Sequence, residues 1–127
     1  MSVIHRFTGH PDEDRYTWDN VEPIAINTGD LHNVMKHVLV GAEDGAQNFI
    51  IRYFQVSFGG HTFHHSHPHE HGIMILHGQA KVIIEERSQS LSPLDSVFIC
   101  GDDTHQLINT GDTTLGFLCV IPCEAEE

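Results

Sequence analysis

Histidines are the residues of this sequence whose type and spacing could support chemistry. Six of the 12 histidines fall within residues 61–71, and His105 stands alone near the start of a later apolar run. In an extended strand, side chains at positions i and i+2 lie on the same face, so His65 and His67 can direct two imidazoles to one point. His71 can supply a third imidazole if the intervening proline, which interrupts strand pairing, lets the chain bend.

Four histidines are predicted to bind one divalent transition metal ion: His65, His67, His71 and His105. Imidazole nitrogen is a ligand of Mn, Fe, Co, Ni, Cu and Zn. Four nitrogen donors without a cysteine exclude an Fe–S cluster and argue against calcium and magnesium, which take oxygen ligands. The expected cofactor is therefore a transition metal ion.

Histidine-rich segments also occur as solvated loops, adventitious chelators or metal-storage tracts. Alternation places His64 on the strand face opposite His65, which favours a role other than metal binding. The same is expected of the remaining histidines, which are His5, His10, His32, His37, His61, His69 and His77. A histidine-rich metal carrier therefore stays open as an alternative, and it predicts several weakly bound ions per chain.

The elements that must position these histidines are short strands. From residue 34 onward, short apolar runs alternate with turn residues such as Gly, Pro and Asp, which predicts many strands and no long helix. The predicted strands span residues 34–40, 48–58, 72–77, 80–85, 96–99, 106–109 and 114–121, with one more near 24–27. This pattern is typical of an all-β antiparallel sandwich or barrel.

The length of 127 residues suits one domain with a sizeable core. We expect an N-terminal arm over residues 1–33, a barrel over 34–123 and an acidic tail over 124–127. The arm is expected to pack over its own domain or over a neighbouring subunit.

The charge of the chain excludes several classes of partner. Eighteen acidic residues against six basic residues give a formal charge of -12, which repels nucleic acid and anionic membrane surfaces. No apolar stretch is long enough for a membrane helix, and the first residues lack the apolar region of a signal peptide. Three cysteines without CxxC spacing are expected to be reduced thiols, so a cytoplasmic protein is predicted.

Residues 59–78 resemble the first cupin motif, in which Gly, five residues, HxH, three residues, Glu, six residues and Gly follow in order. Gly59, His65, His67 and Gly78 are in register with that motif. His71 stands where most cupins have Glu, which is similar to the four-histidine variety of small monocupin.

The second cupin motif is matched in part. His105 and Asn109 fit it, whereas Leu94, Cys100 and Asp102 replace its two glycines and its proline. The run NFIIRYFQVSFGG and the ending FLCVIP also look like those of small manganese-binding monocupins. The resemblance covers about residues 35–122 and leaves the arm outside.

The resemblance implies a cupin jelly-roll β-barrel of two antiparallel sheets, frequently a homodimer, with manganese as the first choice of metal and iron as the second. Nickel, zinc, copper and cobalt remain possible ions. Cupins include dioxygenases, decarboxylases, isomerases, epimerases and plain binding proteins, so the fold leaves the reaction open.

Four neutral imidazoles would leave the 2+ charge of the ion uncompensated, and an octahedral ion would keep two open positions. The leading hypothesis is therefore a Mn- or Fe-dependent oxidoreductase, of the dioxygenase or peroxide type, acting on a small organic substrate. The alternative is a non-redox cupin, either a lyase or isomerase or a small-molecule-binding module.

A mostly apolar pocket is predicted beside the ion. Alternation turns one set of side chains inward, and this set contains Ile73, Leu107, Phe117, Cys119 and Ile121. Arg52 could bind a substrate carboxylate or enolate if it points into the pocket, and a surface ion pair is the equally open alternative.

Overall fold

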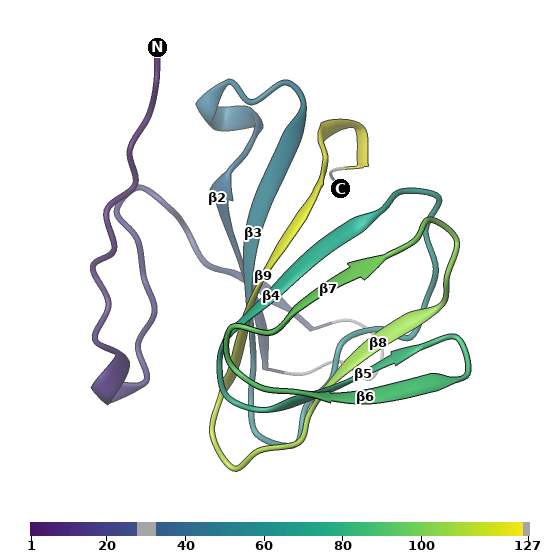
Figure 1. Ribbon diagram of the computed structural model, residues 1–127. Helices are drawn as coiled ribbons and strands as arrows, with labels where there is room; N and C mark the ends of the chain where they lie inside the picture. The colour runs from purple at the N-terminus through teal and green to yellow at the C-terminus, as the bar shows by residue number, and fades with distance from the viewer. Residues whose placement is uncertain (28–32, 126–127) are drawn as a thin grey trace.

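The computed structural model describes residues 1–27 and 33–125 of the chain (Figure 1). His32 therefore lies outside the described residues, as do residues 28–32 of the predicted arm and residues 126–127 of the predicted acidic tail.

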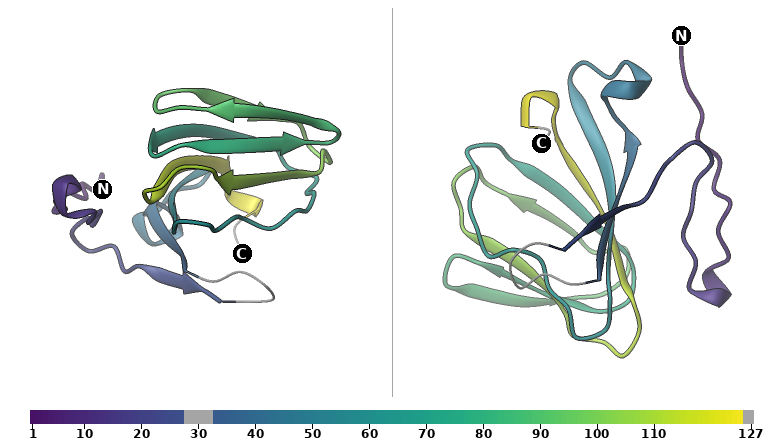
Figure 2. Two further views of the ribbon diagram at one scale, coloured as in Figure 1. Left: turned by 90° about the horizontal axis from the view of Figure 1, so that it is seen from below. Right: turned by 180° about the vertical axis from the view of Figure 1, so that it is seen from behind.

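Two antiparallel sheets form the domain. The larger sheet has the strand order β1 (Ile24–Ile26), β2 (Val34–Val40), β3 (Phe49–Val56), β9 (Leu115–Pro122), β4 (His71–His77) and β7 (Ser96–Ile99). The smaller sheet has the order β6 (Arg87–Leu91), β5 (Ala80–Ile84) and β8 (His105–Asn109). Figures 1 and 2 show the two sheets facing each other as the walls of a barrel, so the predicted all-β fold of two antiparallel sheets is confirmed.

The helical content of the described residues is limited to three short 3₁₀ turns. These are η1 (Pro11–Glu13), η2 (Ala42–Asp44) and η3 (Cys123–Ala125). They lie at chain reversals and near the C-terminal end and bury no residue, so the core is made by the strands.

Strand β6 was missing from the strands expected from the sequence. Its residues read RSQSL, and Leu91 alone among them is buried, so it lacks the apolar alternation by which strands are identified. It forms because its backbone pairs along the whole of β5, after a turn in which Glu85 adopts a positive φ of 54°. Edge strands are often short and polar, which protects them from pairing with another chain.

The strand register decides which side chains face the space between the sheets. Arg52 on β3 lies opposite Cys119 on β9, and Cys119 lies opposite Ile73 on β4. Two residues further along β3, Phe54 lies opposite Phe117 on β9. Because side chains alternate between the two faces of a strand, these two rows share the inner face of the large sheet.

The N-terminal segment forms a small hairpin outside the barrel, joined by the bridges Phe7↔Trp18 and His10↔Arg15. Figures 1 and 2 show it standing beside the larger sheet. The Tyr16 ring stacks on His77 with centroids 3.9 Å apart, and the Trp18 ring lies 5.1 Å from that of Tyr53. The hairpin therefore covers part of the outer face of the large sheet with aromatic side chains.

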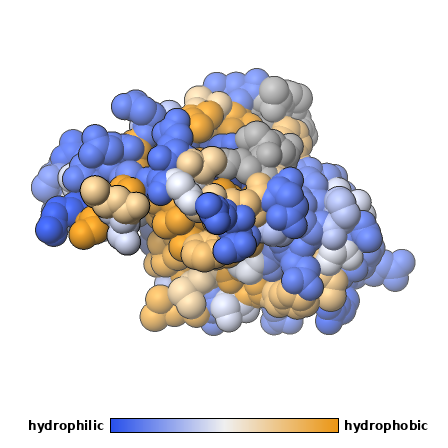
Figure 3. All heavy atoms as spheres, turned by 90° about the horizontal axis from the view of Figure 1, so that it is seen from above, coloured by the Kyte–Doolittle hydropathy of each residue, from blue (hydrophilic) through white to orange (hydrophobic). Residues whose placement is uncertain are grey.

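The surface seen in Figure 3 carries hydrophilic side chains on its outer parts, with apolar side chains gathered between them. Among the described residues, no helix is long and apolar enough to cross a membrane. Each of the three cysteines is a free thiol.

Candidate metal centre

His65 and His67 lie on the segment between β3 and β4, and a backbone pairing with β8 fixes their place. The N–H of His105 donates to the carbonyl of His65 at 2.9 Å, and the N–H of His65 donates to the carbonyl of His105 at 3.2 Å. The His67 carbonyl accepts a further bond from the N–H of Asp102 at 2.5 Å. The alternation argument from the sequence treats this segment as an extended strand, whereas the structure has a loop in which His61 and His65 form isolated bridges with Ile108 and His105.

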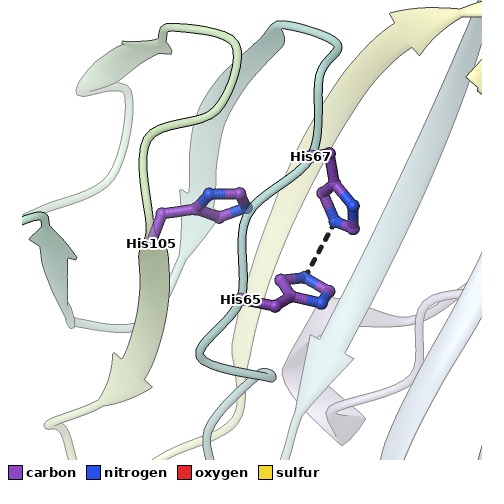
Figure 4. A group of neighbouring side chains, drawn as sticks. All are labelled: His65, His67 and His105. Atoms are coloured by element: carbon purple, nitrogen blue, oxygen red, sulfur yellow. Dashed lines mark hydrogen bonds between the residues drawn. The ribbon is translucent and has the colours of Figure 1, made fainter.

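The four predicted ligands come together from three segments of the chain. Figure 4 shows His65 and His67 side by side on the loop and His105 entering from the start of β8. The Nε2 atoms of His65 and His67 are 3.0 Å apart, and the rings of His71 and His105 lie 4.7 Å apart between centroids. Residues separated by up to 40 positions thus lie close to one another.

The nitrogen atoms fall into two overlapping groups, in each of which they lie within 4.8 Å of one another. One group is His65, His67 and His105, and the other is His67, His69 and His71. His67 belongs to both. His69, for which the sequence favoured a non-ligand role, therefore lies beside the predicted ligands, with its ring stacked on that of His67 at 4.7 Å.

The deeper pair of imidazoles is held with Nε2 available. His71 and His105 are only 6% and 5% exposed, and the Nδ1 of His105 donates to the Asp103 carbonyl at 2.9 Å. Nδ1 of His71 is 3.3 Å from the Cys119 sulfur. A hydrogen bond from Nδ1 fixes the tautomer and leaves the Nε2 lone pair for a metal.

His71 Nε2 has no hydrogen-bond partner within the described ranges 1–27 and 33–125, although it is buried. A buried polar atom without a partner costs free energy. A metal ion at this place would accept the lone pair of Nε2, so the residues present fit such an ion.

The electrostatics of the site keep His71 neutral. Burial lowers the pKa of His71 to about 3, and the nearby charges of His105, His69, Arg52 and His67 act in the same direction. An imidazole must be deprotonated to coordinate a metal. His71 is therefore in the binding-competent form throughout the neutral range.

A cavity of about 330 Å³ opens beside these histidines. Of the side chains predicted to line a pocket, five do so, namely Arg52, Ile73, Leu107, Phe117 and Cys119. Ile121 instead lies in the hydrophobic core, where it is 2% exposed. The sequence analysis missed Ile26, Val34, Lys36, Phe54, Thr62, Phe63 and His69 as lining residues.

Strand pairing explains why Lys36 and Phe54 were missed. Lys36 on β2 lies opposite Phe54 on β3, so the two reach the cavity in the same row. Alternation within β3 could have linked Phe54 to Arg52, two residues away. Nothing in the local sequence of β2 indicates which strand it pairs with.

Turns of the two sequence motifs keep the backbone that glycine favours. Gly59 and Gly78 have positive φ angles of 78° and 84°. Leu94 and Asp102, which stand where the second motif has glycine, also have positive φ angles, of 75° and 68°. Such a conformation costs a side-chain-bearing residue about 1 kcal/mol or more, so the loop geometry is retained although the residues differ.

Asn109 ties this loop system together. Its side-chain nitrogen donates to the carbonyls of Val56 and Thr113 at 3.0 and 2.9 Å, and its side-chain oxygen accepts from the N–H of Gly111 at 3.0 Å. The residue is buried. Its role is to join the end of β3 to the turn between β8 and β9.

The model of the cupin domain matches residues 53–121, which span the loop histidines, β4 to β8 and most of β9. This chain belongs to the cupin family. The two-sheet barrel is the fold of this family, and the remaining question for this cupin is its chemistry.

Relatives with at least a quarter of identical residues carry different names. The chain is 31% identical over 120 residues to a 1-methylthio-D-xylulose 5-phosphate methylsulfurylase of Rhodospirillum rubrum, covering 92% of this cupin and 76% of the relative. A crystal structure of a cupin-2 domain from Rhodospirillum rubrum superposes with a TM-score of 0.81 at 31% identity, over 89% of this chain and 76% of the other. The polyketide cyclase RemF of Streptomyces resistomycificus superposes at 0.78 with 26% identity, over 97% and 80%.

Proposed function

We propose that this cupin is a metal-dependent enzyme that binds one divalent transition metal ion through His65, His67, His71 and His105 and acts on a small organic substrate. Manganese is the first choice of ion and iron the second. The observation that carries the proposal is the buried Nε2 of His71, which has no hydrogen-bond partner in the described part of the chain and lies among other imidazoles.

When bound, the ion would supply Lewis-acid polarisation of a substrate oxygen or, for manganese and iron, redox chemistry with dioxygen or peroxide. The residues of the chain would do the rest. The Asp103 carbonyl orients His105, and the Cys119 sulfur contacts Nδ1 of His71. Apolar side chains such as Phe117 and Leu107 would exclude water and contact the carbon skeleton.

Non-redox Lewis-acid chemistry is the reaction class that we propose first. Two relatives are named as a methylsulfurylase and a polyketide cyclase, and neither name denotes an oxygenase. The cavity also contains the cationic side chains of Lys36 and Arg52, which can stabilise negative charge that develops on a polarised oxygen.

An oxidoreductase of the dioxygenase or peroxide type is the second candidate. It is favoured by the apolar lining around the imidazoles, which includes Phe54, Phe63, Phe117 and Ile73. Apolar walls suit a site that admits a small neutral molecule such as dioxygen beside an organic substrate.

Metal analysis of protein made without a His-tag or nickel column tests the proposal. We expect one ion per chain, manganese or iron, and its loss in His105→Ala. Several weak ions that survive His105→Ala would support a metal carrier and overturn the proposal. Consumption of dioxygen or peroxide by the loaded protein with a panel of organic substrates would select the redox class, and its absence alongside conversion of a substrate would select the Lewis-acid class.

A further inference from the structure

Charge is distributed unequally between the cavity and the rest of the chain. The protein has 18 acidic and six basic residues, yet the cavity is lined by two of the basic residues, Lys36 and Arg52, and by no Asp or Glu of the described residues. The cavity lining is therefore positively charged although the chain as a whole has a formal charge of -12. A positively charged lining, with no acidic side chain among its described residues, indicates that the cavity binds an anion.

The Arg52 side chain is held in place by its neighbours, but not all of its hydrogen-bond donors have an acceptor in the described chain. Its Nη2 donates to the Cys119 sulfur at 3.1 Å, and its guanidinium carbon lies 4.9 Å from the centre of the Phe54 ring. Its Nε is buried and finds no hydrogen-bond partner in residues 1–27 and 33–125. The guanidinium group is thus pre-positioned by an aromatic face and a thiol, and it retains an N–H to donate to a ligand.

Neither cation of the cavity has a carboxylate partner in the part of the chain that the structure describes. The ion pairs found there are His5–Asp44 and Arg15–Glu13, and both lie outside the cavity. A partly buried cation without a counter-charge is costly, because its hydration is reduced and nothing replaces it. A bound anion would supply the missing charge.

The position of Arg52 relative to the imidazoles lets one small molecule reach both. The Cys119 sulfur is 3.1 Å from Nη2 of Arg52 and 3.3 Å from Nδ1 of His71, so the guanidinium and the buried imidazole of His71 are separated by one atom that contacts both. The stacked rings of Phe54 and Phe117, whose centroids are 5.4 Å apart, form an apolar wall of the same cavity. Its volume of about 330 Å³ is at the small end of ligand pockets.

We propose that the substrate is a small organic anion whose carboxylate or phosphate group is bound by Arg52 and Lys36 and whose reacting oxygen faces the four imidazoles. The placement of the reacting oxygen at the four imidazoles rests on the proposed function. Carboxylate and phosphate groups each have at least two neighbouring oxygens, which a guanidinium can bind through two parallel hydrogen bonds. An uncharged substrate would leave both cations unbalanced.

Binding measurements on the manganese-loaded protein by calorimetry test the inference. The probes are pyruvate for a carboxylate and glycerol 3-phosphate for a phosphate, with pyruvamide and glycerol as their neutral counterparts. We expect at least one anion to bind tenfold or more tightly than its neutral counterpart. We also expect Arg52→Gln to weaken that binding by tenfold or more and Lys36→Met by a smaller factor, with unchanged metal content. Lys81→Met is the matched control, because Lys81 does not line the cavity.

Equal binding of anions and neutral counterparts, or anion binding unchanged in both Arg52→Gln and Lys36→Met, would overturn the inference. Lys36→Met keeps the test valid if Arg52→Gln does not fold. Metal content, measured separately on every sample, distinguishes the two proposals. Arg52-dependent anion binding by a chain that takes up no metal would refute the proposed function and support anion recognition. One tightly bound metal ion without anion selectivity would support the proposed function and refute anion recognition.

Discussion

The space between the two sheets and the outer face of the large sheet both contain histidines, and the two sets differ in what their nitrogens contact. On the inner side, His71 and His105 lie 4.7 Å apart among other imidazoles, and Nε2 of His71 has no hydrogen-bond partner in the described chain. On the outer side, His77 uses both nitrogens within the protein. Its Nε2 accepts from the Tyr53 hydroxyl at 2.6 Å, and its Nδ1 donates to the Thr114 carbonyl at 3.1 Å.

His37 shows that a buried imidazole nitrogen without a hydrogen-bond partner in the described chain also occurs outside the candidate metal site. It is buried on the same outer side as His77, and its Nδ1 also lacks a hydrogen-bond partner among the described residues. Its ring neighbours are Trp18 and Tyr53, at 5.7 and 5.4 Å, and neither offers a metal ligand of the usual kind. Burial and a free nitrogen therefore do not suffice for a metal site, because several lone pairs must also converge.

The largest expected effect comes from removing one histidine of each set and measuring metal binding. His71→Ala should weaken metal binding by more than the roughly 10–100-fold that removal of an orienting residue costs, because it deletes a ligand. His77→Ala should keep one ion per chain, since both of its nitrogens already have protein partners. Metal content after gel filtration measures both, and loss of the ion in His77→Ala alone would reverse the comparison.

The next effect concerns the close packing on the outer face. A Cβ at Gly116 would collide with Nε2 of His77 and with the Tyr53 hydroxyl, so Gly116→Ala should lower the free energy of unfolding by about 1–3 kcal/mol. Gly72→Ala is the control, because a Cβ there would lie 3.9 Å from Val120, an ordinary contact. Denaturant unfolding measures both, and metal content should stay unchanged. Equal stability of the two variants would show that the outer cluster is loosely packed.

The outer histidines should also make stability depend on pH. Burial lowers the pKa of His37 and of His77 below 6.5, so the folded chain binds fewer protons than the unfolded chain once the pH falls below that value. The free energy of unfolding is then highest above about pH 6.5 and decreases as the pH falls through and below it.

His77→Phe removes one of these groups and should make the decrease in melting temperature between pH 7.5 and pH 5 shallower. The measurement is made in the presence of a chelator, so that release of a metal does not contribute. An identical slope in the wild-type chain and in His77→Phe would show that His77 is not responsible.

The smallest expected effect is at His69, on the edge of the inner set. It stacks on His67 at 4.7 Å and lies 4.8 Å from His71 between ring centroids. If it only packs against the ligands, His69→Ala should keep one ion per chain and change metal affinity by less than about tenfold, the lower limit for an orienting residue. A loss as large as that of His71→Ala would make His69 a ligand and would require a revised donor set.

Local alternation and turn residues were enough to predict most of the fold. Eight of the nine strands in the described residues follow from apolar runs bounded by turn residues, because one face of each must be buried. Strand β6 could not be found in this way, since its side chains are mostly exposed and its pairing with β5 alone makes it a strand. The left-handed backbone of Leu94 and Asp102 likewise could not be read from residue type.

Residue types and spacing define the chemistry that is available to this protein: closely spaced imidazoles at His65, His67 and His71, a fourth at His105, and no cysteine or carboxylate in the set. The tertiary structure alone decided which groups meet. Pairing of the loop with β8 brings His105 to His65, the register of β2 on β3 places Lys36 in the cavity, and the N-terminal hairpin lies on His77. The physical reason is that such contacts depend on pairing between segments distant along the chain, and local residue patterns carry little information about which segments will pair.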